Sequence, residues 1–304
     1  MYFDLQVNGY AGVDFNSDDL TYEALHAACE LLRDHHLSGI LATIITDELP
    51  AMARRITKLV ALRERDDLIH DMIQGLHIEG PFISPEAGYV GAHPAHAVRP
   101  ARADEMQTLL DAANGLTRIV TLAPEQDPGG RVTRMLTDQA IVVSAGHTNT
   151  DLETLYAAID QGLQMFTHLG NGCPMMLHRH DNIIQRVLSM SDLLYITFIA
   201  DGAHIPYPAL DNYLELVGVE RAIVVTDAIA AAGLGPGQYS LGNQTVDVGS
   251  DGVCWAPDRS HFVGSALTMP QAEINLAEQV GLDEDSIHAL LYANPRNALH
   301  LPLI

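Results

Sequence analysis

The chain has 304 residues and a mass of 33.0 kDa, and 47% of its residues are hydrophobic, which suits one large α/β domain or two small ones. Thirty-nine acidic residues against sixteen basic ones give a formal net charge of −23. A nucleic-acid surface needs clustered Lys and Arg, so nucleic acid is excluded as a partner. The only lysine, Lys58, lies on the polar side of an amphipathic helical pattern, which excludes Schiff-base and carbamylated-lysine chemistry.

The cellular compartment is indicated by what the sequence lacks. Three cysteines without a Cys-x-x-Cys spacing favour a reducing compartment over a disulfide framework. No basic segment followed by an apolar segment opens the chain, so no signal peptide is expected, and no apolar run reaches the roughly 18 residues of a membrane helix. We therefore expect a cytoplasmic protein without a membrane partner.

Short runs of apolar and β-branched residues, typical of buried strands, alternate with helical patterns along the chain. The predicted strands are 3–7, 40–46, 75–78, 118–122, 141–144, 164–167, 194–199 and 222–226. The predicted helices between them are 21–35, 48–65, 103–113, 151–161 and 208–216. Eight such alternations predict an α/β fold, a (β/α)₈ TIM-like barrel. A doubly wound open sheet is the alternative, and the absence of a Gly-x-Gly-x-x-Gly motif after an early strand disfavours it.

The last quarter of the chain departs from this alternation. Residues 233–258 are rich in glycine and turn residues, and the runs 239–241 and 244–248 flank a Gly-Asn pair, which predicts a β-hairpin insertion. Two terminal helices are predicted at 268–279 and 284–299. Nothing marks a second domain, so residues 1–304 are predicted to form a single catalytic barrel domain.

Polar and titratable side chains recur where the predicted strands end. In a (β/α)₈ barrel, the carboxyl ends of the strands carry the active site. One such histidine could be a hydrogen-bonded structural residue, but their joint occurrence in phase with six strands favours a composite site. The residues are Gln6 and Asn8, His77 and Glu79, His147, His168 and Asn171, His204, and Asp227.

Three of these residues form a possible metal site. Glu79, His147 and His168 make a set of two histidines and one carboxylate, which suits a catalytic Zn²⁺, or Fe²⁺, with a position left open for water. Such a metal lowers the pKa of its water from about 15.7 to about 7. Asp227 could take the proton of that water. His77 lies two residues deeper on its strand, so we expect it to be packed in the barrel, with support of a metal ligand as the alternative.

Seven motifs, in chain order and spread over nearly the whole chain, resemble the N-acetylglucosamine-6-phosphate deacetylase family of the amidohydrolase superfamily. They are His77-Ile-Glu-Gly-Pro-Phe82, Gly91-Ala-His-Pro94 with Val98-Arg99, Ser144-Ala-Gly-His147-Thr148, Thr167-His-Leu-x-Asn171, Asp201-Gly-x-His204, Val225-Thr-Asp-Ala228 and Gly264-Ser-x-Leu-Thr-Met269. Each motif alone is a weak signal, and the seven together in order are a strong one.

The resemblance implies catalytic roles for the strand-end residues. Glu79, His147 and His168 match the metal ligands, and Asp227 matches the general base and acid. His93 matches the residue that helps to polarise the amide carbonyl. The implied reaction is hydrolysis of a linear amide, which converts N-acetylglucosamine 6-phosphate to glucosamine 6-phosphate and acetate (EC 3.5.1.25 type).

The resemblance also implies the residues that bind the sugar phosphate. His204, Asn171 and Gly172 match positions that hold the sugar. Arg179 matches an arginine that binds the phosphate, often across a homodimer, and we therefore expect a homodimer. His178 and His180 flank Arg179 and could add positive charge to that pocket.

Gln6 and Asn8 replace the His-x-His that many amidohydrolases carry on their first strand, and we place both among the substrate-binding residues. Neutral amides are poor zinc ligands beside imidazole, so one metal is expected instead of two. The placement of the only lysine, Lys58, on a helix surface agrees with one metal, because no carbamylated lysine is then available to bridge two metals.

Departures from the family leave other functions open. The family usually adds a small β-sandwich from both chain ends, and the predicted barrel leaves no room for it. One alternative is an amidohydrolase for another N-acyl or cyclic amide substrate. The other is a catalytically inactive barrel that binds a ligand, although the complete set of Glu79, His147, His168 and Asp227 argues against it.

Overall fold

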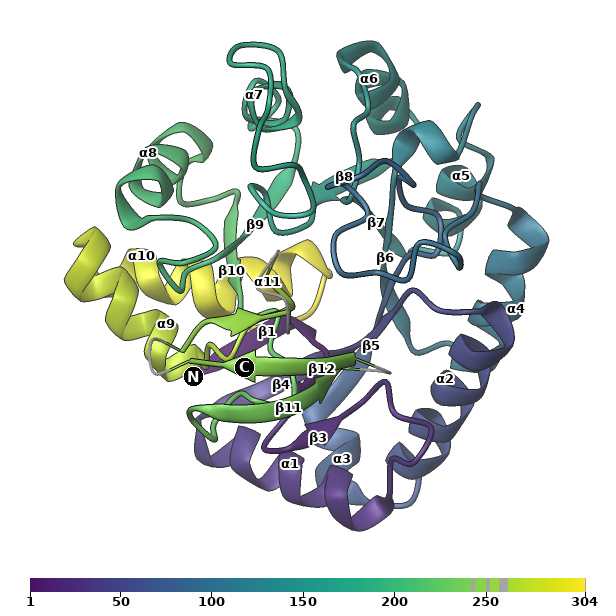
Figure 1. Ribbon diagram of the computed structural model, residues 1–304, viewed down its shortest axis with the longest axis vertical. Helices are drawn as coiled ribbons and strands as arrows, with labels where there is room; N and C mark the ends of the chain where they lie inside the picture. Colours follow the sequence, from purple (N-terminus) through teal and green to yellow (C-terminus); the bar gives the residue numbers. More distant parts are fainter. Residues whose placement is uncertain (242–243, 250–251, 257–261, 304) are drawn as a thin grey trace.

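A computed structural model describes residues 1–304 except 242–243, 250–251, 257–261 and 304. Its centre is an eight-stranded parallel sheet in the order β1-β4-β5-β6-β7-β8-β9-β10. Figure 1 shows the strands surrounded by helices, as expected for a (β/α)₈ barrel. The strands are β1 (Tyr2–Val7), β4 (Leu37–Ile45), β5 (Ile73–Glu79), β6 (Thr117–Leu122), β7 (Val142–Ala145), β8 (Leu163–Phe166), β9 (Tyr195–Ile199) and β10 (Ala222–Val225). The barrel and its eight predicted strands are confirmed.

The first and last strands meet through a short contact. A parallel bridge joins Val7 to Ala228, and the backbone N–H groups of Asn8 and Gly9 both donate to the carbonyl of Ala228, at 2.7 and 3.1 Å. Residues near the beginning of the chain therefore lie beside residues more than 200 positions later. This contact brings the end of β1 into the same site as the end of β10.

The helices on the outside bury their apolar faces against the strands. The five predicted helices are confirmed, and three short ones (α3, α5 and α7) were not predicted, because six or seven residues are too few for a clear 3.6-residue period. The helices before the C-terminal region are α1 (Tyr22–Asp34), α2 (Leu49–Arg63), α3 (Asp67–Met72), α4 (Ala103–Ala113), η1 (Pro124–Gln126), α5 (Arg131–Thr137), α6 (Leu152–Asp160), α7 (Ile183–Leu188) and α8 (Tyr207–Val217).

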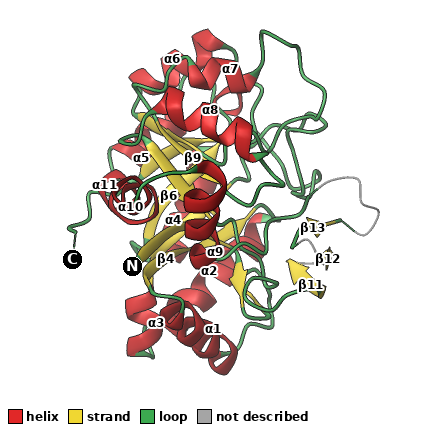
Figure 2. Cartoon of the chain, turned by 90° about the vertical axis from the view of Figure 1, so that its left-hand side faces the viewer, coloured by secondary structure: helices red, strands yellow, loops and turns green. Residues whose placement is uncertain are grey.

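The C-terminal part supplies a small sheet and the last helices. Strands β11 (Gly237–Leu241) and β12 (Gln244–Val248) pair as the predicted hairpin, whose Gly-Asn turn lies outside the described residues, and β13 (Cys254–Trp255) adds a third strand. Figure 2 shows this sheet on the side of the barrel away from both chain ends. The two predicted terminal helices are present as α9 (Met269–Asn275) with η2 (Leu276–Val280), and α10 (Glu284–His288) with η3 (Ala289–Ala293) and α11 (Asn294–Ala298). A minor hairpin, β2 (Gly9–Tyr10) and β3 (Val13–Asp14), follows β1.

Polar side chains fill part of the barrel interior below the strand ends. His77 is buried, and its ring contacts the carbonyl of Leu5 at 3.1 Å and the hydroxyl of Thr121 at 2.7 Å. Burial lowers the pKa of His77 to about 4, so the ring is neutral. Thr121, Thr167 and Ser144 continue the chain of hydroxyl contacts at 2.7 and 2.6 Å. The prediction that His77 is a packed residue is confirmed.

Asp4 is a buried acid on the inward face of β1. Its carboxylate accepts hydrogen bonds from the backbone N–H groups of Gln6 and Thr226 and from the hydroxyl of Thr226. Burial raises its pKa from 3.8 to about 7, although these hydrogen bonds oppose the shift. Between about pH 4 and pH 7, Asp4 in the folded protein therefore keeps a proton that it has released in the unfolded chain.

This proton makes the stability depend on pH. A raised pKa in the folded state gives a contribution that is complete below the unfolded pKa and is lost as the pH rises toward 7. We expect Asp4→Asn, which cannot titrate, to gain stability relative to the wild type as the pH is raised from about 4 to 7. Urea unfolding of both proteins at several pH values measures this change. A stability difference that does not vary with pH would contradict it.

Candidate active site

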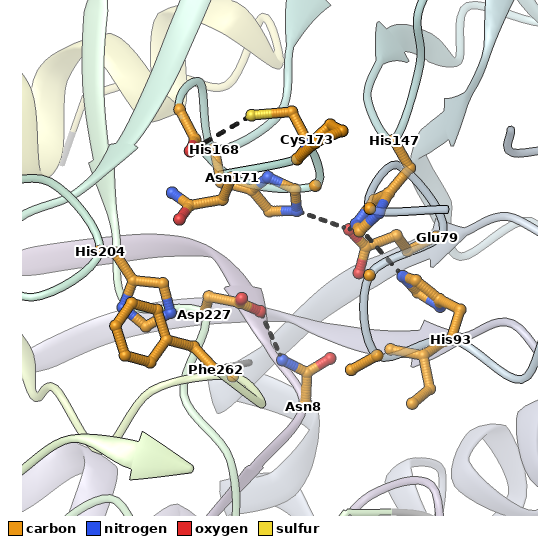
Figure 3. A pocket seen from close by; sticks show the side chains of 18 of the residues that line it. Asn8, Glu79, His93, His147, His168, Asn171, Cys173, His204, Asp227 and Phe262 are labelled. Carbon is orange, nitrogen blue, oxygen red and sulfur yellow. Dashed lines mark hydrogen bonds and ion pairs between the residues drawn. The ribbon is translucent and has the colours of Figure 1, made fainter. Parts of the chain in front are cut away.

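A pocket of about 630 Å³ opens at the carboxyl ends of the barrel strands, and Figure 3 shows it from close by. It brings together most of the residues that the sequence singled out. The predicted residues that line it are Asn8, Glu79, His93, His147, His168, Asn171, Gly172, His204 and Asp227. Glu79, His147 and His93 project from one side, and Asp227 and His204 project from the other.

Three of these side chains form a group that could hold a metal. Glu79 is the last residue of β5, and His147 and His168 each follow a strand end by two residues. Their ligand atoms lie within 4.8 Å of one another, with His168 Nε2 at 2.9 Å and His147 Nε2 at 3.3 Å from Glu79 Oε1. All three residues are buried.

The hydrogen-bond partners of His147 test whether a metal fits this group. Its Nδ1 lies 2.8 Å from the carbonyl oxygen of Tyr89, which can only accept, so Nδ1 must carry a proton. In the neutral ring, Nε2 then directs a lone pair at the carboxylate of Glu79. Two acceptors facing each other need a cation between them, and a backbone carbonyl behind a ligating histidine is the usual supporting contact of a metal site. The donor set therefore fits a divalent metal.

The backbone at the site is held in an uncommon conformation. His147, His168 and Asp227 have φ values of 50°, 34° and 50°, in the left-handed region that non-glycine residues rarely adopt. Each costs about 1–3 kcal/mol and persists only where the surroundings enforce it. Glycines allow the close packing around His147, since a Cβ at Gly172 or Gly91 would lie within 3 Å of the His147 ring.

Glu79 is ionised at neutral pH. Burial alone would raise its pKa, but the adjacent imidazoles of His147 and His168 outweigh this effect and hold the pKa well below the ordinary value of 4.5. Gln6 also directs its amide at this carboxylate, with Nε2 at 3.3 Å from both oxygens. Gln6 therefore lies behind Glu79, outside the group of residues that line the pocket.

Asp227 differs from Glu79 in its protonation. Burial and the charge of Glu79 raise the pKa of Asp227 to about 6, while His168 and a hydrogen bond from Asn8 act in the opposite direction. That hydrogen bond runs from Asn8 Nδ2 to Asp227 Oδ1 at 2.7 Å. A carboxyl group with a pKa near neutrality can both accept and donate a proton during turnover.

Two further histidines border the pocket. Burial lowers the pKa of His93 to about 3, helped by the neighbouring His147, so the ring is neutral, and its Nε2 lies 3.2 Å from His147 Nε2. His204 directs Nδ1 at the carboxylate of Asp201 at 2.6 Å, an acceptor that fixes the proton on Nδ1. The opposite edge of the His204 ring remains for a ligand.

The predicted substrate residues divide into two groups. Asn171 and Gly172 line the pocket, and Asn171 Nδ2 is buried and unpaired among the described residues. Arg179, His178 and His180 are exposed on the segment before α7 and do not line this pocket. Their role in binding phosphate stays a prediction.

An aromatic wall was not predicted from the sequence. Trp255 and Phe262 line the pocket, with ring centroids 4.5 Å apart, and Phe262 lies 4.9 Å from the ring of His204. Both residues come from the region of the small sheet, where no strand-end rule applies. The tryptophan, the only one in the chain, next to a glycine-rich hairpin was the available signal.

No model of a known protein family matches the chain. It is 34% identical over 310 residues to N-acetylglucosamine-6-phosphate deacetylase from Homo sapiens, covering 99% of this chain and 74% of the human enzyme. It is 32% identical over 247 residues to the enzyme of the same name from Bacillus subtilis, covering 81% of this chain and 61% of that enzyme, so it spans less than two thirds of the bacterial protein.

The solved structures agree with these relatives. An Asp-to-Ala mutant of N-acetyl-D-glucosamine-6-phosphate deacetylase from Mycobacterium smegmatis, in complex with N-acetyl-D-glucosamine-6-phosphate, superposes with a TM-score of 0.88 at 29% identity. The alignment covers 99% of this chain and 77% of that one. The parallel barrel with a Glu-His-His group at its strand ends defines a hydrolase of the amidohydrolase type. Within that class, the chain belongs to the N-acetylglucosamine-6-phosphate deacetylase family.

We predict that Phe262→Ala weakens substrate binding more than it slows the chemical step. Removing an aromatic wall costs about 1 kcal/mol of contact, so KM should rise roughly 3- to 10-fold while kcat changes less than about twofold. Steady-state kinetics on the best substrate checks this. Tyr156→Ala, an exposed tyrosine on α6, is the control and should leave both constants unchanged. A fall in kcat without a change in KM would refute the binding role.

Proposed function

We propose that this protein is a metal-dependent deacetylase that hydrolyses N-acetylglucosamine 6-phosphate to glucosamine 6-phosphate and acetate. The observation that carries the proposal is the meeting of Glu79, His147 and His168 with Asp227 in one pocket. Membership of the deacetylase family supports the amino-sugar substrate. We expect the enzyme to act in the cytoplasm, and among the described residues no helix is long and apolar enough to cross a membrane.

Glu79, His147 and His168 would hold one divalent metal, Zn²⁺ or alternatively Fe²⁺. When bound, such a metal supplies Lewis acidity, which polarises an acyl carbonyl and lowers the pKa of water. Gln6 and Asn8 are occupied with Glu79 and Asp227, as expected for a site that holds a single metal.

Asp227 is the proton carrier in this proposal. The amide of Asn8 holds Oδ1, and we assign Oδ2 to the water that attacks the acyl carbon. Asp227 takes the proton of this water as the new C–O bond forms. It then gives the proton to the amine nitrogen as the C–N bond breaks, so that the free amine and acetic acid leave, and the acid releases its remaining proton to give acetate.

The other pocket residues orient the substrate. A ring N–H of the neutral His93 would donate to the acyl oxygen as negative charge develops there. His204, fixed by Asp201, would contact a sugar hydroxyl through its free edge. Asn171 and Gly172 would hold the sugar with amide and backbone groups, and the unpaired Nδ2 of Asn171 is available for this contact.

The phosphate needs positive charge that one copy of the chain does not offer in the pocket. No Lys or Arg is found among the described residues that line it, and the net charge of −23 repels an anion. We propose a homodimer in which Arg179, with His178 and His180, reaches the pocket of a second copy. Met175 and Met176, on the same segment, are 94% and 89% exposed and would be covered by that copy.

The same observation favours a second candidate, a deacylase for an uncharged N-acyl substrate. We predict that Arg179→Ala lowers kcat/KM at least tenfold for the 6-phosphate and less than twofold for unphosphorylated N-acetylglucosamine, because only the phosphate needs the guanidinium. Arg131→Ala, on α5, is the control. Equal wild-type rates on both sugars would favour the second candidate.

One experiment tests the reaction itself. Acetate release should be measured from a panel of N-acetylated hexosamines with and without a 6-phosphate, in added Zn²⁺ and after treatment with a chelator. We expect activity on the phosphorylated sugars, loss of activity with the chelator and recovery with the metal. Activity that persists in a metal-free preparation would exclude the proposed chemistry.

We predict that Asp227→Asn reduces kcat by at least about 10³-fold, because the amide cannot carry the proton. The variant should still bind one metal per chain, since Asp227 is not part of the metal-capable group. Steady-state kinetics and elemental analysis measure the two quantities. Near-wild-type turnover would rule out the role of Asp227.

A further inference from the structure

The position of Asp227 depends on residues that do not line the pocket. Asp227 follows β10 in a turn formed by Thr226, Asp227 and Ala228, and its φ of 50° lies in the left-handed region. No glycine occupies the turn to ease this conformation. Contacts from elsewhere in the fold must therefore enforce it.

The first set of contacts comes from β1. Asp4, 1% exposed, accepts hydrogen bonds from Thr226 through both its backbone N–H, at 3.3 Å, and its hydroxyl, at 2.5 Å. The same hydroxyl oxygen accepts the backbone N–H of Ala228 at 3.1 Å. The Thr226 hydroxyl thus ties the residue after Asp227 to a fixed acid on the first strand.

The second set of contacts comes from the segment before α9. Ser265 donates its hydroxyl to the carbonyl of Thr226 at 2.7 Å and its backbone N–H to the carbonyl of Asp227 at 3.0 Å. The hydroxyl of Ser265 is itself held by the backbone N–H of Leu267 at 2.9 Å. Both peptide groups that flank Asp227 are therefore held by Ser265 in addition to the contacts from Asp4.

Together these contacts leave Asp227 little freedom except rotation of its side chain. Asn8 restricts that rotation, because its Nδ2 donates a hydrogen bond to Asp227 Oδ1. Proton transfer requires hydrogen-bond reach of roughly 2.6–3.2 Å, and a displacement of about 1 Å can cost 10²-fold in rate. The turn thus controls whether the carboxylate reaches the reacting water.

We propose that Asp4, through the hydroxyl of Thr226, is a positioning residue that places the Asp227 carboxylate for proton transfer. Asp4, Thr226 and Ser265 lie outside the residues that line the pocket, so they act through Asp227 and not on the substrate. The inference rests on the proposed role of Asp227 as proton carrier.

The test removes one hydroxyl at constant shape. Thr226→Val keeps the backbone N–H group that donates to Asp4. It loses the hydroxyl that donates to Asp4 and accepts from the backbone N–H of Ala228. We expect kcat to fall 10- to 100-fold, with KM and metal content within twofold of the wild type, because the metal-capable residues lie on other strands. A variant that loses metal, raises KM and lowers kcat to the same degree has a general structural defect and would overturn the proposal.

The chain offers a matched control. Thr133 donates both its backbone N–H and its hydroxyl to one buried carboxylate, that of Asp127, at 2.8 and 2.9 Å, at the start of α5 and away from the pocket. Thr133→Val should lose stability but keep kcat. Thr226→Ser, which retains the hydroxyl, should keep at least about half of the wild-type kcat. The role of the Thr226 hydroxyl would be refuted if either Thr133→Val or Thr226→Ser had a kcat as low as that of Thr226→Val.

A crystal structure of Thr226→Val provides a readout that does not need activity. We expect the backbone of residues 226–228 to change conformation and the Asp227 carboxylate to lose its contact with Asn8. An unchanged backbone at these residues would overturn the proposal. If the wild type were inactive on every acetylated sugar, the proposed function would be refuted. The crystal structure of Thr226→Val would then still test whether Thr226 positions Asp227. If Thr226→Val does not fold, Asp4→Asn takes its place in the same measurements, with the same expected loss of kcat, because an amide nitrogen in place of Oδ2 cannot accept the Thr226 hydroxyl.

Discussion

The carboxylate of Glu79 is the contact on which the site depends. It is fully ionised, it meets the imidazoles of His147 and His168, and Gln6 supports it from behind. A buried carboxylate with partners on three different parts of the chain fixes the relative positions of β1, β5, β7 and β8 at their carboxyl ends. Its charge also raises the pKa of Asp227 across the pocket. The two acids of the site thus differ in protonation because Glu79 lies against two imidazoles and an amide N–H group, whereas Asp227 faces the negative charge of Glu79.

The interior beneath this contact is unusual for a barrel core. Barrel interiors are dominated by branched aliphatic side chains. Here His77 and the hydroxyls of Thr121, Thr167 and Ser144 form a continuous hydrogen-bonded layer under the metal-capable group. Every member has a partner within the layer, so burial of these polar groups is compensated. The hydrogen bonds of this layer link β5, β6 and β7 to the end of β8 directly below the metal-capable group.

Much of the fold and the site could be predicted from the sequence. Short runs of apolar and β-branched residues predicted the eight strands, and the rule that barrel sites lie at strand carboxyl ends selected Glu79, His147, His168 and Asp227. The rest could not be predicted for physical reasons. Helices of six or seven residues, such as α7, have too few turns for a periodic signal, and the wall of Trp255 and Phe262 depends on how the small sheet folds over the pocket. The exposed position of Arg179 depends on tertiary packing, and no local pattern encodes it.

The closure of the barrel has a consequence for folding. Asn8 meets Asp227 across 219 positions of sequence, and Asp4 meets Thr226 across 222. Contacts of such long sequence separation form late, because the entropy of closing the loop must be overcome before they contribute. Helices and neighbouring strand pairs involve much shorter sequence separations, so their formation does not depend on the contacts that place Asp227. The placement of Asp227 is therefore a property of the closed ring, because a chain whose first and last strands were not joined would lose the contacts from Asn8 and Asp4 that hold this residue.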